Sequence, residues 1–238
     1  MTYKAIAIIP ARGGSKRIPR KNLVSIGEKP LIVHSILSAL KSRYLKNNVF
    51  VSTEDKEIAI VSKKYGAQII ERPKDLATDE STTLFALKHA VNYLEKNGVV
   101  FDTAVLLQPT SPFRRTETID LGLEKLWNNW QQLDVIFSIR PAHHPYYWQL
   151  KIKNEILSFV LSNNFSKVRS QDFDKTYEID GLLYVIKKDF LKKAKGYQFS
   201  KGRSSYMISN KIEAVEIDDD DDLSIARSLL KSKRLWKQ

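Results

Sequence analysis

Short apolar runs and longer amphipathic segments alternate along the first 140 residues, and this alternation constrains the fold more than any other feature. The first run, Ala5–Ile9, is continuously apolar, which is typical of a strand buried on both faces. Similar runs follow at Val49–Val51, Ala67–Ile70, Ala104–Leu107 and Val135–Ile139. Strands and helices alternating at this spacing predict an α/β fold, a three-layer Rossmann-like and mostly parallel sheet with helices on both faces.

The segments between these runs predict helices, because their apolar residues recur at steps of three and four. The predicted helices are Leu31–Leu40, Asp55–Tyr65, a helix from about Ser81, and a helix carrying Ile119 to Trp130. In parallel sheets of this kind, ligands bind beyond the carboxyl ends of the strands. We therefore expect the functional residues in the polar loops that follow the strands.

The alternation stops at residue 141, which divides the chain into three parts. Residues 1–140 form the α/β core, and residues 141–178 read as an inserted sub-domain with a hairpin-like, aromatic-rich pattern suited to a subunit contact. Residues 179–238 return to the core sheet. There we expect strands at Leu182–Ile186 and Ala214–Ile217 and a final helix over Leu223–Leu235.

Composition narrows the class of protein. Of the 238 residues, 42% are hydrophobic, which can supply a real core, and no apolar run approaches the ~20 residues that span a bilayer. We therefore expect no membrane partner. The chain has no cysteine, which favours a cytoplasmic location and rules out thiolate metal sites. The net charge of +12 attracts polyanions, but aromatic and basic residues do not interleave, so we do not expect nucleic acid as a partner.

A basic loop, PARGGSKRIPRKN, follows the first predicted strand directly. It places Arg12, Lys16, Arg17, Arg20 and Lys21 around Gly13, Gly14 and Ser15. Glycines allow backbone N–H groups to turn towards an anion, and arginine and lysine add charge-assisted hydrogen bonds to phosphate. The loop matches neither GxxxxGK[ST] nor GxGxxG. On its own it predicts polyphosphate binding, and the alternative is a solvated basic loop.

The sequence of this loop also resembles a known family. IIPARGGSKRIPRKNL resembles the opening of the CMP-sialic acid synthetases, also called acylneuraminate cytidylyltransferases. VSTEDKEIA, ERPKDLATDESTT and LLQPTSPFRR resemble later blocks of that family, in the same order and spacing. The likeness covers nearly the whole chain and is strongest up to Arg115. It also places the chain near the cytidylyltransferases for legionaminate, pseudaminate and the eight-carbon acid Kdo.

The resemblance implies a role for each matching position. Arg12 and Lys21 would hold the triphosphate of CTP and act in catalysis together with Asp218. The remaining nucleotide-binding positions would be Gly13, Gly14, Ser15, Lys16, Asn22, Arg72 and Thr82. The sugar acid would meet Gln108, Thr110, Ser111 and Tyr184, and Arg169, which resembles an arginine delivered across a dimer interface. The family likeness thus implies a homodimer that binds CTP and a sugar acid.

Several of these residues have plainer interpretations when taken singly. Gln108, Thr110 and Ser111 could merely cap a proline-bounded turn. Arg72 alone would be expected at the surface, as most arginines are. Arg114 could bind a sugar carboxylate or be a surface charge, and for Arg115 the surface is favoured.

The acidic run VEIDDDDDLSIA also has two interpretations. Carboxylates in the first turn of a helix favour its dipole, so most of Asp219–Asp222 are expected to be capping residues. Glu216 and Asp218 lie two apart on the predicted strand, so their side chains point the same way and suit Mg²⁺ beside a triphosphate. The family has an aspartate where this chain has Glu216, and often Asn-Gly where it has Asp180-Gly181. The latter difference indicates either another substrate or a side chain that faces elsewhere.

Together these features predict a nucleotidyltransferase, an N-acylneuraminate-type cytidylyltransferase. It would join CTP to a nine-carbon 2-keto sugar acid, releasing pyrophosphate, with Mg²⁺ as cofactor. Two alternatives from the enzyme class are a transferase for Kdo or for a sugar 1-phosphate. The alternative outside that class is a basic nucleotide- or nucleic-acid-binding protein, which leaves Glu216 and Asp218 without a role.

Overall fold

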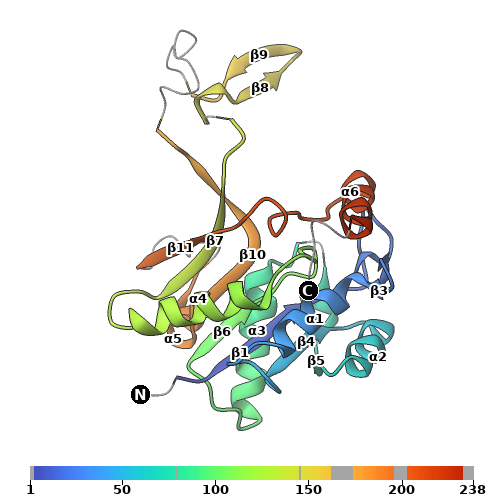
Figure 1. Ribbon diagram of the computed structural model, residues 1–238, viewed down its shortest axis with the longest axis vertical. Helices are drawn as coiled ribbons and strands as arrows, with labels where there is room; N and C mark the ends of the chain where they lie inside the picture. Colours follow the sequence, from blue (N-terminus) through green and yellow to red (C-terminus); the bar gives the residue numbers. More distant parts are fainter. Residues whose placement is uncertain (1–2, 79, 145, 162–173, 196–202, 233–238) are drawn as a thin grey trace.

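The chain folds around one central sheet, shown in a computed structural model that describes residues 3–78, 80–144, 146–161, 174–195 and 203–232 (Figure 1). The seven strands lie in the order β11-β7-β10-β6-β1-β4-β5, and all run in the same direction except β10. Their bounds are β1 Ala5–Pro10, β4 Val49–Thr53, β5 Gln68–Glu71, β6 Thr103–Leu106, β7 Val135–Pro141, β10 Tyr177–Lys187 and β11 Ser204–Ile208. The predicted α/β fold with a mostly parallel sheet is confirmed.

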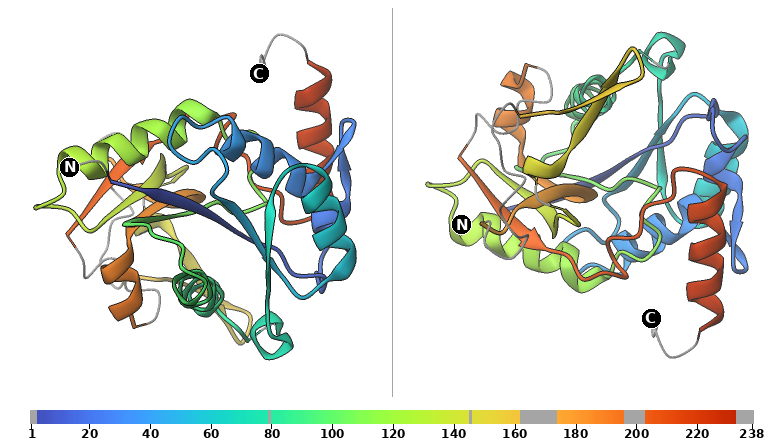
Figure 2. Two further views of the ribbon diagram at one scale, coloured as in Figure 1. Left: turned by 90° about the horizontal axis from the view of Figure 1, so that it is seen from below. Right: turned by 90° about the horizontal axis from the view of Figure 1, so that it is seen from above.

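Helices cover both faces of this sheet, and Figure 2 shows them on either side of the strands. The helices are α1 Leu31–Leu40, α2 Lys56–Lys64, α3 Thr83–Lys96, α4 Thr116–Asn128, α5 Lys188–Lys193 and α6 Asp220–Lys231. Short 3₁₀ helices occupy Lys21–Leu23, Lys74–Ala77 and Tyr146–Trp148. None of the described helices combines the length and the apolar character that crossing a bilayer requires.

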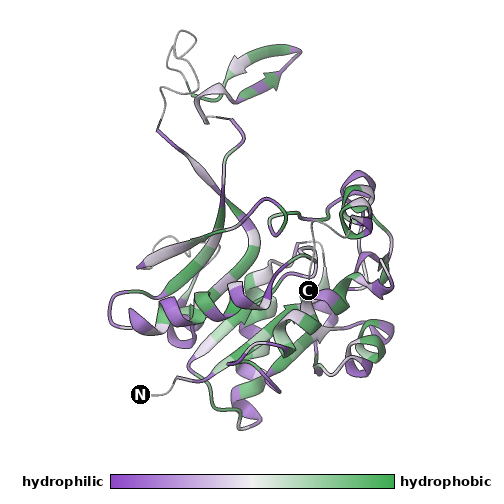
Figure 3. Ribbon diagram, viewed as in Figure 1, coloured by the Kyte–Doolittle hydropathy of each residue, from purple (hydrophilic) through white to green (hydrophobic). Residues whose placement is uncertain are grey.

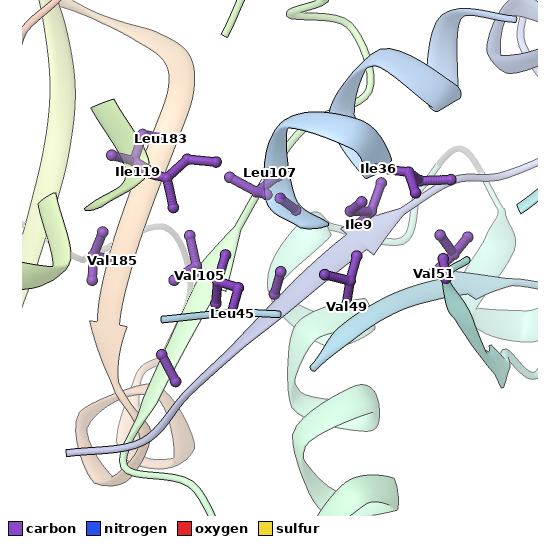
Figure 4. Packing of buried hydrophobic residues seen from close by; sticks show 14 of the residues in the cluster. Ile9, Ile36, Leu45, Val49, Val51, Val105, Leu107, Ile119, Leu183 and Val185 are labelled. Carbon is purple, nitrogen blue, oxygen red and sulfur yellow. The ribbon is translucent and has the colours of Figure 1, made fainter. Parts of the chain in front are cut away.

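Strand residues alternate between the two core layers, as the period of two in a strand requires. Ala7 and Ile9 of β1 pack with α1, α2 and α4, whereas Ile6 and Ile8 pack with α3 and α5. Figure 4 shows the first layer, in which Ile36 and Ile119 lie over the strands. Gly122 lets α4 approach β10 closely, since a Cβ there would lie 2.8 Å from a methyl group of Leu183.

A two-stranded hairpin extends from the sheet on the long arms of β7 and β10 (Figure 1). Its strands are β8 Leu150–Lys153 and β9 Ile156–Phe159, joined by a turn in which Asn154 and Glu155 both have positive φ. The hairpin-like pattern predicted for the insertion is therefore confirmed. Much of the hairpin ribbon is hydrophobic in Figure 3 although every residue in its strands is exposed.

The end of the chain differs from the prediction. Ala214–Ile217 does not form a strand, because Ile217 N–H donates to the carbonyl of Thr110 instead of to a neighbouring strand. The late strand is β11, which pairs in parallel with β7 at the sheet edge. Its residues alternate between exposed and half-buried, so β11 lacks the apolar run that revealed the inner strands. Helix α6 begins at Asp220, before the predicted Leu223.

A second, small two-stranded ribbon lies beside α6. It consists of β2 Ser25–Ile26 and β3 Lys29–Pro30, and Arg227 of α6 donates to the carbonyl of Ser25. Ile26, Ile217 and Leu223 share a third apolar cluster. This cluster fastens helix α6 to the segment that follows the basic loop.

Candidate active site

A cavity of about 400 Å³ opens at the carboxyl ends of the strands. It is lined by Pro10, Arg12, Ser15, Lys16, Arg17, Lys21, Asn22, Arg72, Leu76, Thr78, Ser81, Thr82, Thr83, Ala86, Gln108, Pro109, Thr110 and Asp218. The cavity thus combines the loops after β1, β5 and β6 with the acidic run before α6. This is the edge of the sheet where the sequence predicted a ligand site.

Most of the basic loop faces this cavity. Arg12, Ser15, Lys16, Lys21 and Asn22 all line it, and Asn22 Nδ2 donates to the Arg12 carbonyl at 2.9 Å, which holds the two ends of the loop together.

Other parts of the loop turn away. Gly13 and Gly14 are not among the lining residues, and Gly13 N–H donates to Glu54 Oε1 at 2.7 Å. Arg20 adopts a left-handed conformation and pairs with Asp55 at 2.7 Å and Glu57 at 2.6 Å, outside the cavity.

Lys21 joins the basic loop to the acidic run. Its Nζ donates to the carbonyls of Ile217 at 2.9 Å and Asp218 at 3.0 Å, and lies 3.3 Å from Asp218 Oδ1. Arg17 also approaches Asp218, at 3.4 Å. The cation that the resemblance assigns to the triphosphate and the carboxylate that it assigns to the metal therefore lie side by side.

The predicted nucleotide-binding residues Arg72 and Thr82 also line the cavity, after β5 and before α3. Arg72 is only 6% exposed, so the expectation that it lies at the surface is wrong. Burial lowers the pKa of Arg72, while pairing of its Nη2 with Glu54 Oε2 at 3.0 Å opposes that shift. Thr82 takes the N-cap position of α3 without a side-chain capping bond.

The predicted sugar-binding residues are only partly brought together. Gln108 and Thr110 line the cavity, and Thr110 Oγ1 donates to Glu216 Oε1 at 3.2 Å. Ser111 is only 1% exposed and is not among the residues that line the cavity. Tyr184 lies in β10 with its ring edge-on to Phe137 and is not among the lining residues. Arg169 lies outside the described residues.

The structure contradicts both interpretations given for Arg114, a sugar-carboxylate ligand or a surface charge. Arg114 is 2% exposed, and it donates to the carbonyls of Leu182 at 2.6 Å and Gln108 at 2.8 Å and to Ser35 Oγ at 2.9 Å. Burial lowers its pKa to about 9, and the nearby carboxylate of Asp180 opposes that shift. Arg114 is thus neither a surface charge nor a residue facing the cavity. Arg115, in contrast, is exposed as expected.

Asp180 faces the protein interior. Its Oδ1 accepts hydrogen bonds from Ser138 Oγ and from Leu182 N–H at 3.1 Å. The next residue, Gly181, has a φ of +71° at a register shift in β10, and a Cβ there would lie 3.1 Å from the Gln108 side-chain nitrogen. Of the two explanations for Asp180-Gly181, the structure therefore supports a side chain that faces elsewhere.

The acidic run caps the last helix, as predicted for most of its residues. Asp219 caps α6, and its side chain and that of Asp222 form a reciprocal capping box, as predicted for these residues. Glu216 is half-buried, and burial together with the neighbouring charge of Asp218 raises its pKa. No group of three or more candidate metal-ligating side chains occurs among the described residues, so Glu216 and Asp218 stand as a pair.

The sequence-based prediction missed two carboxylates that shape the site, the half-buried Glu54 and the buried Glu213. Glu54 contacts both Gly13 and Arg72, and its signal was the acidic turn in VSTEDKEIA, opposite the basic loop. Glu213 accepts hydrogen bonds from Arg115 N–H and from Thr118 Oγ1, which anchors the segment before Glu216 to α4. No local pattern distinguished Glu213 from an ordinary surface glutamate.

Comparison with known proteins agrees with this geometry. The family model for cytidylyltransferases matches residues 6–238. The pseudaminic acid cytidylyltransferase of Campylobacter jejuni is 31% identical over 235 residues, which are 96% of this chain and 97% of that protein. The CMP-N,N'-diacetyllegionaminic acid synthase of Legionella pneumophila is 44% identical over 122 residues, 51% of this chain and 52% of that protein.

A solved structure shares the fold. The CMP:2-keto-3-deoxy-manno-octonic acid synthetase complexed with CTP superposes with a TM-score of 0.70 at 20% identity, covering 97% of this chain and 99% of that one. With the family model matched along nearly the whole length and a relative matched over nearly its full length, the chain belongs to the cytidylyltransferase family.

Proposed function

We propose that this chain transfers CMP from CTP to a nine-carbon 2-keto sugar acid, a sialic acid or a related nonulosonate, and releases pyrophosphate. The observation that supports this proposal most is the composition of one cavity. Basic loop residues, Arg72, Gln108, Thr110 and Asp218 all line it. The relatives named for pseudaminic and diacetyllegionaminic acids point to the same class of substrate.

In the proposed reaction, the anomeric hydroxyl oxygen attacks the α-phosphorus in line. The bond from the α-phosphorus to the bridging oxygen breaks, and pyrophosphate leaves. Lys21 and Arg12 stabilise the charge that develops on the phosphate oxygens, because preorganised cations need no rearrangement during the reaction. Gln108 and Thr110 orient the sugar acid. Arg72 and Thr82 bind the nucleoside end of CTP.

The pair Glu216 and Asp218 fits a divalent cation such as Mg²⁺. The two carboxylates are close enough for Asp218 to raise the pKa of Glu216, which is the mutual repulsion that a bound cation would relieve. Mg²⁺ prefers oxygen ligands and usually takes one or two carboxylates together with phosphate oxygens and water. When bound, it would neutralise negative charge on the triphosphate.

We further propose that the protein acts as a homodimer through the hairpin of residues 150–159 in the inserted sub-domain. Large apolar side chains are exposed there, at Leu150, Ile152, Ile156, Leu157 and Phe159. A monomer would leave this patch in water, which costs free energy that a second copy can recover. The change Ile152→Asp should shift the protein to half its native mass in light scattering, whereas the exposed helix change Ile60→Asp should not.

One assay tests the proposed reaction. Pyrophosphate release is measured with CTP and, in turn, sialic, legionaminic, pseudaminic and Kdo acids, with and without Mg²⁺. Release with a nine-carbon acid supports the proposal, and release with Kdo alone favours the eight-carbon alternative. If a sugar 1-phosphate is the substrate instead, the free acids give no release. Inactivity with all four acids would contradict the proposal.

A further inference from the structure

The carboxylate of Glu54 lies across the ends of three neighbouring strands. Glu54 follows β4, and its Oε1 accepts from Gly13 N–H at 2.7 Å, directly after β1. Its Oε2 accepts from Arg72 Nη2 at 3.0 Å, directly after β5. One side chain thus connects the basic loop to the buried Arg72, which lines the cavity.

The Glu54 carboxylate offsets the repulsion between two arginines at the cavity. Arg12 and Arg72 both line the cavity, and the charge of Arg12 disfavours the charged form of Arg72. Glu54 supplies the opposite charge, at a position where burial strengthens the interaction. Arg72 Nε is buried and has no hydrogen-bond partner among the described residues. The Glu54 carboxylate therefore also fixes the direction in which the guanidinium points.

The backbone packs tightly at the same place. A Cβ on Gly13 would lie 2.4 Å from Asp55 Oδ2, so the loop can pass this acidic turn only because Gly13 has no side chain. Asp55 in turn accepts from the N–H groups of Glu57 and Ile58 as the N-cap of α2. The turn that carries Glu54 therefore packs directly against the basic loop at Gly13.

Glu54 does not occupy the place of a ligand. Neither Glu54 nor Gly13 is among the residues that line the cavity, and the Glu54 side chain is only 16% exposed. A carboxylate that merely filled an empty phosphate site would lie inside the cavity, in contact with Lys16 or Lys21. Glu54 instead lies outside the cavity and contacts Gly13 and Arg72, so we expect it to act on CTP through these two residues.

We propose that Glu54 is a positioning residue for the nucleotide, which sets the spacing between the phosphate-binding loop and the arginine at the nucleoside end. This inference rests on the proposed function, because it takes CTP as the ligand of the cavity. Glu54 would act mainly on the nucleotide, since Arg72 follows β5, and β1 and β4 separate that strand from β6, which leads to Gln108 and Thr110. Loss of the Glu54 charge should therefore weaken the binding of CTP and leave the binding of the sugar acid unchanged.

The test compares Glu54→Gln with Glu57→Gln, a neighbouring glutamate whose ion pair with Arg20 is exposed. CTP binding is measured calorimetrically without sugar acid, and KM is measured for both substrates. For Glu54→Gln we expect the Kd and KM for CTP to rise about 10- to 100-fold, as the loss of a hydrogen-bonded, partly buried charge implies, with the sugar-acid KM within about twofold. Glu57→Gln should match the unchanged protein.

Two results would overturn the inference. One is CTP binding by Glu54→Gln that equals or exceeds that of the unchanged protein, which a competing anion would produce. The other is an equal rise in both KM values, which indicates a general structural role. If Glu54→Gln does not fold, Glu54→Asp keeps the charge but cannot span both contacts, and unchanged CTP binding by that variant overturns the inference equally.

The same data separate the two proposals. If the unchanged protein binds CTP but turns over none of the acids, the proposed reaction fails, and calorimetry of the Glu54 variants still decides the inference. If the unchanged protein is active and Glu54→Gln is indistinguishable from it, the inference fails while the reaction stands.

Discussion

Lys21 and Asp218 are 197 positions apart in the sequence, yet Lys21 Nζ lies 3.0 Å from the backbone carbonyl and 3.3 Å from a carboxylate oxygen of Asp218. The lysine follows the first strand and the aspartate precedes the last helix. Their contact joins the basic loop to the acidic run at the cavity. The proposed reaction needs both charges at that point, one for the phosphate and one for the cation.

Lys21→Met should lower kcat for pyrophosphate release by roughly 10²- to 10³-fold, the usual cost of removing a preorganised group that stabilises transition-state charge. Steady-state kinetics with saturating CTP would measure it. Lys63→Met, which removes an exposed lysine from α2, should leave kcat unchanged. Near-normal turnover by Lys21→Met would show that this lysine does not act on the transferred phosphate.

Chelation with EDTA should abolish pyrophosphate release, and added Mg²⁺ should restore it. In Asp218→Asn, the Mg²⁺ concentration that restores half of the activity should rise by roughly tenfold or more, because a neutral amide is a weaker ligand than a carboxylate. Asp221→Asn, an exposed change in the same acidic run, provides the control. Equal Mg²⁺ requirements in the two variants would argue against Asp218 as a ligand.

Arg114→Met should destabilise the protein by about 3–5 kcal/mol, because it strands the buried Asp180 and leaves the carbonyls of Leu182 and Gln108 without their donor. The change Lys64→Met, at an exposed position of α2, should cost about 0.5 kcal/mol or less. Urea unfolding at neutral pH measures both. Similar costs would contradict the burial that the structure assigns to Arg114.

Asp134 should make the stability depend on pH in the acid range. Hydrogen bonds from Arg203 hold the pKa of Asp134 below its usual 3.8, and Lys187 adds to the effect. A lowered folded-state pKa contributes stability above the ordinary value, and that stability is lost as the pH falls through the folded-state value. Asp134→Asn should therefore be less stable at pH 7, with the difference shrinking below pH 3.8.

Denaturant unfolding from pH 7 to the acid limit would follow that difference. Glu155→Gln serves as the control, because Glu155 is exposed on the turn of the hairpin. If the difference in unfolding free energy between Asp134→Asn and the unchanged protein stays constant on acidification, the ion pair with Arg203 does not set the pKa of Asp134.

Much of the fold could be predicted because inner strands carry a direct signal. A strand buried on both faces must be apolar throughout. The strands at Ala5–Ile9 and Ala104–Leu107 could therefore be recognised from their own residues, without knowing which strands they pair with. Strand β11 lies at the edge and is half-exposed, so its pattern carried no such signal. The segment Ala214–Ile217 is apolar in part for another reason, since Ile217 packs beneath α6.

The sequence by itself determined the sheet, the basic loop and the family likeness, because each depends on residues that are close together in the chain. Tertiary structure decided which charges face the cavity. Arg20 turns to Asp55 and Glu57, Arg114 is buried beside Asp180, and Glu54 connects Gly13 to Arg72. The physical reason is that a charge takes its role from the partner it meets, and these partners come from other loops of the sheet.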